Sequence, residues 1–442
     1  MTSGGVKKPD FHQDVLVTGL TEMGNMLVRF LASVMVARGL GAEGRGVYAL
    51  ALAAPGLLLG FTNIGLGEAT TVLIGKGKYP RERVIASMNC LVLLIAVLGF
   101  AVYFGLSPLV MKALKHNMPA DVYALAFCVF PLTLYWGGNA SAALGLSMVK
   151  QVSWGRLLNN SVFLALVTVL YLRGAGIKAV LAAFIAALLT ENVYLFGRVR
   201  RAAAVGLRWD PEMIREQAVL GWHVFWGGLF LQVTRRLDIF LLNYFAGPGP
   251  LGVYVVAYSV AEFILTVPGI YSRAAFSSAA VSSGEDAFRV SNAAVRQTLF
   301  LMAGLAVFLG VIMRVFISKV YGVEFLPAVL PALLLLPGVV LFGFGGLLGT
   351  IFTGYARPRE LMRSAAVSCA LTVALDLLLI PRYGAVGAAA ASAAAYAAGA
   401  LWILAAYLKF SRARASEVLL VGTEDFLAYR DRVRDFFKGG KT

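Results

Sequence analysis

Charged residues lie inside long apolar runs of this sequence, where a charge needs either a partner or water. The arginines are Arg29, Arg235 and Arg236, and the carboxylates are Glu22, Asp238, Glu262 and Asp376. A charge at the centre of a bilayer costs about 3 kcal/mol on insertion scales, so such residues mark substrate or ion pathways. A guanidinium group stays protonated and offers paired donors to phosphate oxygens. We therefore expect these residues to bind an anionic group or an ion within a membrane.

The spacing of the polar residues places several of them on common helical faces, because positions three or four apart lie on one side of a helix. The first apolar run carries Thr18, Glu22, Asn25, Arg29 and Ser33, and the eighth carries Tyr254, Tyr258 and Glu262. We predict a cavity lined by Asn25, Arg29, Gln232, Arg235, Arg236, Tyr254 and Tyr258. The carboxylates are predicted to couple an ion or to form ion pairs, with Glu22 beside Arg29 and Asp238 beside Arg235.

The composition requires helices that span a membrane to position these residues. Hydrophobic residues make up 59% of the 442 residues and charged residues 14%, with a mean hydropathy of +0.78. Soluble chains average about 25% charged residues, so an ordinary soluble enzyme is excluded. A spanning helix takes about 20 apolar residues, and the runs predict an all-α polytopic membrane protein with about twelve spans. The predicted spans are 15–38, 46–70, 84–107, 121–148, 152–172, 177–198, 218–244, 250–276, 296–317, 327–354, 361–380 and 384–408.

The polar segments between the spans predict the domain organisation and the orientation. We expect an N-terminal lobe over 1–200, a cytoplasmic linker over 201–217, a C-terminal lobe over 218–408 and a cytoplasmic amphipathic tail over 409–442. Lysine and arginine are roughly three times as frequent on the side that holds both ends of the chain, which predicts that both termini are cytoplasmic. The net charge of +16 is then explained by the inner membrane face and does not indicate nucleic acid.

The two predicted lobes contain an internal repeat. When the first two spans are laid over spans seven and eight without a gap, Arg29 falls on Arg235 and Gly41 on Gly247. In the same register, Gly46-Val47-Tyr48 falls on Gly252-Val253-Tyr254. Six helices separate the matched spans, so both copies run in the same direction, as in the parallel repeats of some secondary transporters.

Several segments resemble one family of bacterial membrane proteins. The stretch 377–391, LLLIPRYGAVGAAAA, resembles a signature of bacterial polysaccharide flippases. The segments YGVEFLPA (321–328), TGYARP (353–358) and RLDIFLLN (236–243) are similar to further parts of that family in the same order. The family is the oligosaccharide-flippase (Wzx-like) branch of the multidrug/oligosaccharidyl-lipid/polysaccharide exporter superfamily. One departure is Asp376, which stands where the family usually carries asparagine.

The resemblance implies two six-helix lobes around a central cavity and alternating access for a lipid-linked oligosaccharide, an isoprenoid diphosphate that bears sugars. It implies a place in the bacterial cytoplasmic membrane, in the biosynthesis of a surface polymer such as the O-antigen of lipopolysaccharide. Implied partners are membrane lipids, a polysaccharide polymerase and chain-length machinery. An exporter of drugs or organic cations in the same superfamily is the alternative, although intramembrane arginines disfavour a cationic cargo.

The sequence carries no pattern typical of an enzyme. It has no glycine-rich phosphate loop that ends in Gly-Lys-Ser or Gly-Lys-Thr. The three histidines, His12, His116 and His223, lie far from other ligands at metal spacing. We therefore predict neither catalysis nor a cofactor, and leave Na⁺ or H⁺ coupling open. A membrane-embedded polymerase or ligase is disfavoured because no long external loop is predicted.

Overall fold

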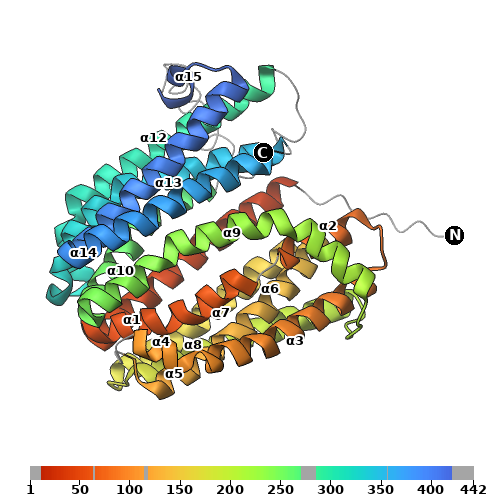
Figure 1. The fold of residues 1–442 in the computed structure, drawn as a ribbon, viewed down its shortest axis with the longest axis horizontal. Helices are drawn as coiled ribbons and strands as arrows, with labels where there is room; N and C mark the ends of the chain where they lie inside the picture. The colour runs from red at the N-terminus through yellow and green to blue at the C-terminus, as the bar shows by residue number, and fades with distance from the viewer. Residues whose placement is uncertain (1–10, 63–64, 114–117, 270–284, 356, 421–442) are drawn as a thin grey trace, which may run out of the picture. The chain divides into compact units, whose positions relative to one another are not determined.

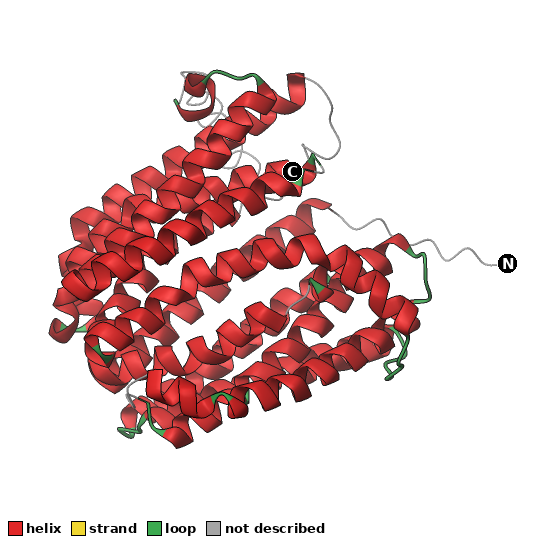
Figure 2. Ribbon diagram, viewed as in Figure 1, coloured by secondary structure: helices red, strands yellow, loops and turns green. Residues whose placement is uncertain are grey.

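The computed structural model describes residues 11–62, 65–113, 118–269, 285–355 and 357–420. Within these ranges the ordered elements are helices, and no strand is present (Figure 2). The prediction of an all-α polytopic membrane protein is confirmed. The chain divides into two compact units: Met1–Leu229 with Gly247–Gly252, and Phe230–Ala246 with Val253–Thr442.

Unit 1 is a bundle in which α1 packs on α7, α7 on α8, and α2 on α6. The apolar core between α2, α3, α6 and α8 contains the fully buried side chains of Ile85, Met88 and Phe130. The elements, labelled in Figure 1, are α1 (Phe11–Thr62), α2 (Leu66–Lys76), α3 (Arg81–Gly105), α4 (Ser107–Ala113), α5 (Ala120–Phe127), α6 (Val129–Gly145), α7 (Val149–Leu172), α8 (Ile177–Ala202) and the first part of α9 (Pro211–Ala246).

Unit 2 is centred on the close packing of α13 against α14. A Cβ added at Gly338 would overlap the backbone of Ala393, and one at Gly345 would lie 3.3 Å from Ala400 Cα. Small residues on both helices therefore let the two backbones approach, as is common in membrane bundles. The elements are the rest of α9, α10 (Pro248–Ala261) from Val253 on, the 3₁₀ helix η1 (Glu262–Leu265), α12 (Glu285–Phe316), the π-helix η2 (Ile317–Tyr321), the 3₁₀ helix η3 (Val323–Ala328), α13 (Val329–Gly354), α14 (Pro358–Ser411) and α15 (Ala415–Leu419).

Two of the helices each hold two predicted spans. A non-helical glycine interrupts each one: Gly41 in α1, with φ 67°, and Gly384 in α14, with φ 54°. The described residues contain nine segments long and apolar enough to cross a membrane, and the two longest, Thr21–Thr62 and Arg359–Ser411, contain these breaks. At about 1.5 Å per residue, both segments are at least about twice as long as a bilayer core of about 30 Å requires. Helix α9 is not among the nine; it contains two arginines and an aspartate that lower its hydropathy.

The second predicted span has a different end. It was predicted to run to residue 70, but α1 ends at Thr62 and α2 begins after Gly65, whose φ of 63° is left-handed. The fourth predicted span, 121–148, is present as one segment long and apolar enough to cross a membrane, Ala120–Gly145, in which a turn at Cys128 separates α5 from α6. The predicted amphipathic helix of the tail, from Thr423 to Phe437, lies outside the described residues.

Two equivalent positions of the repeat touch each other within unit 1. Gly247 has a φ of 87°, so it breaks the chain before α10 as Gly41 does within α1. A Cβ added at Gly46 would overlap the carbonyl oxygen of Pro248, and one at Gly252 would overlap that of Ala42. In the register of the repeat, Ala42 corresponds to Pro248 and Gly46 to Gly252. The two helix starts therefore cross in reciprocal backbone contact, which we call the glycine crossing.

Candidate functional site

In unit 2, charged and hydroxyl side chains from α9, α10, η1 and α14 form one connected cluster. Arg235 on α9 donates from its Nη2 to Glu262 Oε1 at 2.6 Å and from its Nε to the Tyr258 hydroxyl at 3.3 Å. The Arg235 side chain is 32% exposed and that of Glu262 28%. The pair is thus half-buried, and Arg235 is held by groups on the two elements that follow α9.

Asp238 lies one turn further along α9 and is almost fully buried. The hydroxyl of Tyr254 on α10 donates to Asp238 Oδ2, and the N–H of Ile239 donates to its Oδ1 at 2.8 Å. The Tyr254 oxygen also lies 3.2 Å from Ser392 Oγ on α14. Asp238 and Tyr254 are each only 1% exposed. The Tyr254 hydroxyl, which donates to Asp238 and lies beside Ser392, therefore links α9, α10 and α14.

Asp376 on α14 is a second fully buried carboxylate in this cluster. Neither of its carboxyl oxygens has a hydrogen-bond partner among the described residues. It lies within electrostatic range of Asp238. Thr372, one turn before it, also has a buried hydroxyl that no described residue satisfies. A buried ionised carboxylate is stable only when it is paired, so Asp376 requires either a proton or a bound cation.

The predicted ion pairs along single helices are wrong. Arg235 and Asp238 were expected to pair on α9; instead Arg235 pairs with Glu262, and Asp238 accepts from Tyr254. Asp238 faces the buried side of α9, whereas Arg235 remains half-exposed and reaches the next elements of the chain. Glu22 was expected beside Arg29; instead it accepts a hydrogen bond from Ser153 at 3.1 Å.

The polar stripe of α1 in unit 1 packs against α7. Asn25 is 6% exposed and donates to the Ser153 carbonyl oxygen at 3.4 Å. Its own oxygen accepts from Asn160 at 3.2 Å. Arg29, one turn further along α1, is exposed, and among the described residues it has no ion-pair or hydrogen-bond partner. The polar stripe thus presents the exposed guanidinium of Arg29 near a network of amides and a hydroxyl that also binds the carboxylate of Glu22.

The remaining predicted residues lie in the same two regions. Gln232 and Arg236 are half-buried on α9, and Arg236 is within electrostatic range of Asp238. Tyr258 is half-buried, with its ring centre 6.5 Å from that of Tyr254. The sequence analysis missed the partners Ser153, Asn160, Thr372 and Ser392. Small polar residues in apolar helices are common, and the spacing of Thr372 and Asp376 by one helical turn was the available signal.

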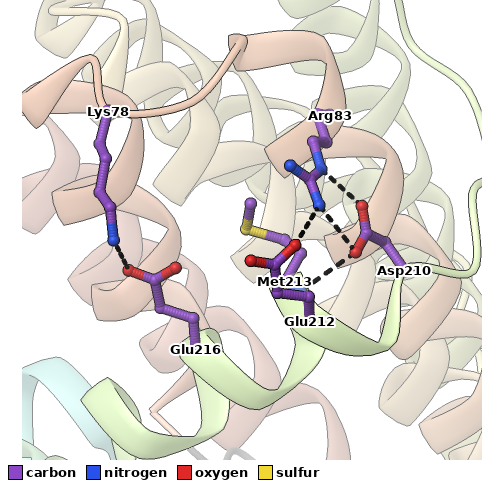
Figure 3. Close-up of polar contacts among 6 residues, drawn as sticks. All are labelled: Lys78, Arg83, Asp210, Glu212, Met213 and Glu216. Carbon is purple, nitrogen blue, oxygen red and sulfur yellow. Dashed lines mark hydrogen bonds and ion pairs between the residues drawn. The ribbon is translucent and has the colours of Figure 1, made fainter.

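A second charged cluster lies where the linker enters α9, and it ties that helix to α3 within unit 1 (Figure 3). Arg83 donates to both oxygens of Asp210, at 2.6 and 3.1 Å, and to Glu212 at 2.9 Å. Lys78 donates to Glu216 at 2.9 Å. The hydrogen bonds from Arg83, and then from the N–H of Met213, lower the pKa of Asp210 to about 2. We call this set of five residues the linker clasp. Its ion pairs hold the start of α9 against α3 and the turn before it, which is a structural role.

The fold and the unit 2 cluster define a class: a polytopic helical membrane protein with charged groups held inside its helices. The chain belongs to the family described as polysaccharide biosynthesis protein, whose model matches residues 11–277. No curated protein sequence matches the chain.

Several solved structures have a similar fold. A multidrug-resistance MATE-family transporter of the MOP superfamily, inward-facing, has a TM-score of 0.70 at 14% identity over 88% of this chain and 96% of that chain. The lipid II flippase MurJ, inward closed, has a TM-score of 0.71 at 16% identity over 89% of this chain and 87% of that chain. A MOP-superfamily transporter from Pyrococcus furiosus, described as having a binding pocket of reversed polarity, has a TM-score of 0.60 at 13% identity over 90% and 93%.

Proposed function

We propose that this protein is a flippase that moves a lipid-linked oligosaccharide, carried on an isoprenoid diphosphate, from the inner to the outer leaflet by alternating access. The family to which the chain belongs supports a role in surface-polysaccharide biosynthesis. We further propose the bacterial cytoplasmic membrane as its location, both termini in the cytoplasm, and lobes over 1–200 and 218–408. A polysaccharide polymerase and chain-length proteins are its proposed partners, and we assign it no catalytic step.

The exposed guanidinium of Arg29 is the observation that carries this proposal. A diphosphate that leaves water needs cationic donors that cannot deprotonate, and arginine supplies them in a planar pair. Arg29 lies on a polar helix face within an apolar run, and the described part of the chain provides no acid to neutralise it. Outward movement of an anion also gains about 2.3 kcal/mol per charge per 100 mV of inside-negative potential.

The test is transport of a fluorescent lipid-linked oligosaccharide in proteoliposomes containing the purified chain. We expect Arg29→Ala to abolish transport and Arg29→Lys to reduce it, because lysine keeps the charge but loses the planar fork. Arg173→Ala, at an exposed arginine that caps the end of α7, is the matched control and should transport normally. Normal transport by a well-folded Arg29→Ala variant would refute the proposed site.

We also propose that the buried carboxylates Asp238 and Asp376 couple transport to an ion. The unpartnered oxygens of Asp376, beside a second buried carboxylate, support this role because one proton or one Na⁺ would relieve the unpaired charge. We expect Asp376→Asn to remove the dependence of transport on the ion gradient while cargo binding persists. Collapsing the Na⁺ and the H⁺ gradients separately, at fixed membrane potential, distinguishes the two ions; no response to either would refute coupling.

An exporter of organic cations remains the alternative, and the MATE-family neighbour has the same fold. Intramembrane arginines repel a cationic cargo, which favours the anionic one. Exchange of an organic cation for protons or Na⁺ by the purified chain, without movement of lipid-linked sugar, would establish the alternative.

A further inference from the structure

A cavity of about 550 Å³ lies in unit 1, between α3, α6 and the segment that leads from α8 into α9. We call it the linker groove; it is lined by Asn89, Val92, Leu93, Ala96, Pro131, Tyr135, Val205, Gly206 and Leu207. Its volume is within the range of about 300–1,000 Å³ that is typical of small-molecule sites. Most of these side chains are apolar, so hydrocarbon is the natural content of the groove.

Asn89 is the amide side chain that lines the groove. Its NH₂ group makes a hydrogen bond, whereas its carbonyl oxygen makes none with the described residues. Its Nδ2 donates to the Gly206 carbonyl oxygen at 3.2 Å, which holds the linker against α3. Its Oδ1 is buried and accepts no hydrogen bond from any residue that the structure describes, although the side chain is only 7% exposed. Buried acceptors of this kind are uncommon in native proteins. The polar end of the groove is therefore the end that lies against the linker.

The linker segment beside the groove is cationic and interfacial. The N–H of Arg208 donates to the Ala86 carbonyl oxygen at 3.3 Å, so its backbone is fixed beside α3. The Arg208 side chain is exposed between Leu207 and Trp209, which are 65% and 60% exposed. Tryptophan and arginine together mark the boundary between hydrocarbon and water. The adjacent acid, Asp210, accepts its hydrogen bonds from Arg83 and Met213, so Arg208 interacts with it only through longer-range electrostatics and keeps its donors for an anion.

We propose that the linker groove binds one anionic phospholipid of the cytoplasmic leaflet, for which phosphatidylglycerol is the probe. The order of residues along α3 matches such a lipid. The phosphate lies at Arg208, the headgroup extends from it toward water, and one acyl chain follows Val92 and Ala96 deeper into the membrane. The leaflet follows from the orientation proposed above, whereas the lipid is not the transported cargo and its binding is independent of transport.

The experiment is native mass spectrometry of the full chain released from nanodiscs that contain phosphatidylglycerol and phosphatidylcholine in equal amounts. We expect one phosphatidylglycerol to remain bound per chain. Ala96→Phe fills the groove and should lower this retention at least tenfold. Val97→Phe adds the same ring at the neighbouring position, which is 59% exposed and does not line the groove, and should retain the lipid. Arg208→Gln changes only an exposed side chain and should remove the preference for phosphatidylglycerol over phosphatidylcholine.

Each other result would overturn the proposal. Equal retention by Ala96→Phe and the parent would show an adventitious lipid elsewhere on the surface. Equal binding of both phospholipids, unchanged by Arg208→Gln, would exclude an anionic site. Recovery of an isoprenoid lipid from the groove in place of phospholipid would assign it to the tail of the cargo. Because transport is not measured here, failure of this proposal leaves the proposed flippase function standing.

Discussion

The two copies of the internal repeat place an arginine at the same position in very different surroundings. Arg235, in the second copy, is bound by Glu262 and Tyr258. Arg29, in the first copy, is exposed and has no partner among the described residues. In the register of the repeat, Glu262 corresponds to Gly56 and Asp238 to Ala32. Both of these acids are thus absent from the first copy, in which the acid on the same helix face, Glu22, accepts its hydrogen bond from Ser153.

This difference indicates that the two copies of the repeat have different roles, which the sequence repeat does not reveal. Equal arginines suggested two equal contacts to a diphosphate. The structure instead supplies an exposed arginine in unit 1 that has no ion-pair partner among the described residues, and in unit 2 an Arg235–Glu262 pair beside two buried aspartates. We therefore expect Arg29 to dominate cargo binding and unit 2 to respond to ions.

The largest effect is expected when unit 1 is given the acid that it lacks. Gly56→Glu places a carboxylate at the position equivalent to Glu262, where it should pair with Arg29. Transport should fall by about a hundredfold, since neutralising a key charge at a binding site costs about 2–5 kcal/mol. Proteoliposome transport of the lipid-linked oligosaccharide measures it.

The control for that change is Gly56→Gln, which adds the same bulk without the charge. It should transport close to the parental rate. If both variants lose transport equally, bulk at position 56 is the cause, and the contrast between the two arginines carries no functional meaning.

The next largest effect concerns the equivalent tyrosines, Tyr254 and Tyr48. Both tyrosines are buried. Tyr254 donates to the carboxylate of Asp238, whereas the first copy has alanine, Ala32, at the position equivalent to Asp238. Tyr254→Phe should destabilise the protein by about 1.5 kcal/mol, the lower end for a hydrogen bond to a charged group. Tyr48→Phe should cost less than half of that. Thermal unfolding in detergent compares them, and equal shifts would contradict the assignment.

A smaller effect is expected when the arginine of unit 2 is released. Glu262→Gln removes the counter-charge of Arg235 and makes that copy resemble unit 1. Half-exposed pairs are worth about 0.2–1 kcal/mol, so the affinity for the cargo should rise by at most about fivefold. Titration of the purified chain with the lipid-linked oligosaccharide measures the affinity. A large loss of affinity would mean that the pair itself contacts the cargo.

The smallest effect is expected in the linker clasp, where the charges of unit 1 are structural. The folded-state pKa of Asp210 is lowered from 3.8 to about 2, so its stabilising contribution is complete above pH 3.8 and is lost as the pH falls through about 2. Asp210→Asn should lower the thermal midpoint at pH 6, and the difference should vanish toward pH 2. Glu212→Gln, at a side chain 73% exposed, should change little at any pH.

Much of the fold could be predicted because hydrophobic run length and helix geometry are local properties. The boundary between the last two spans, predicted between residues 380 and 384, lies at Gly384, where the left-handed backbone favours glycine. The end at Thr62 and the turn at Cys128 were missed because both lie inside apolar sequence, where hydropathy does not change.

The sequence predicted which residues form the site, but it did not predict which of them pair with one another. Intramembrane arginines and acids stand out in any apolar run, so Arg235, Asp238 and Glu262 were identified. Their partners depend on the rotation of each helix against its neighbours. Spacing along α9 could not reveal that Asp238 accepts a hydrogen bond from Tyr254 on α10, or that the Tyr254 hydroxyl also lies beside Ser392 on α14.

The glycine crossing bears on how such a chain can change. Gly46 meets Pro248, and Gly252 meets Ala42, so each partner contacts the counterpart of its own neighbour. That reciprocity is the defining property of an isologous interface, the kind that joins two identical subunits about a two-fold axis. The crossing thus has, inside one polypeptide, the geometry of a contact between two identical subunits. In a homodimer a single mutation would alter both sides of such a contact, whereas in this chain each glycine can be changed alone, so the two sides can be tested separately.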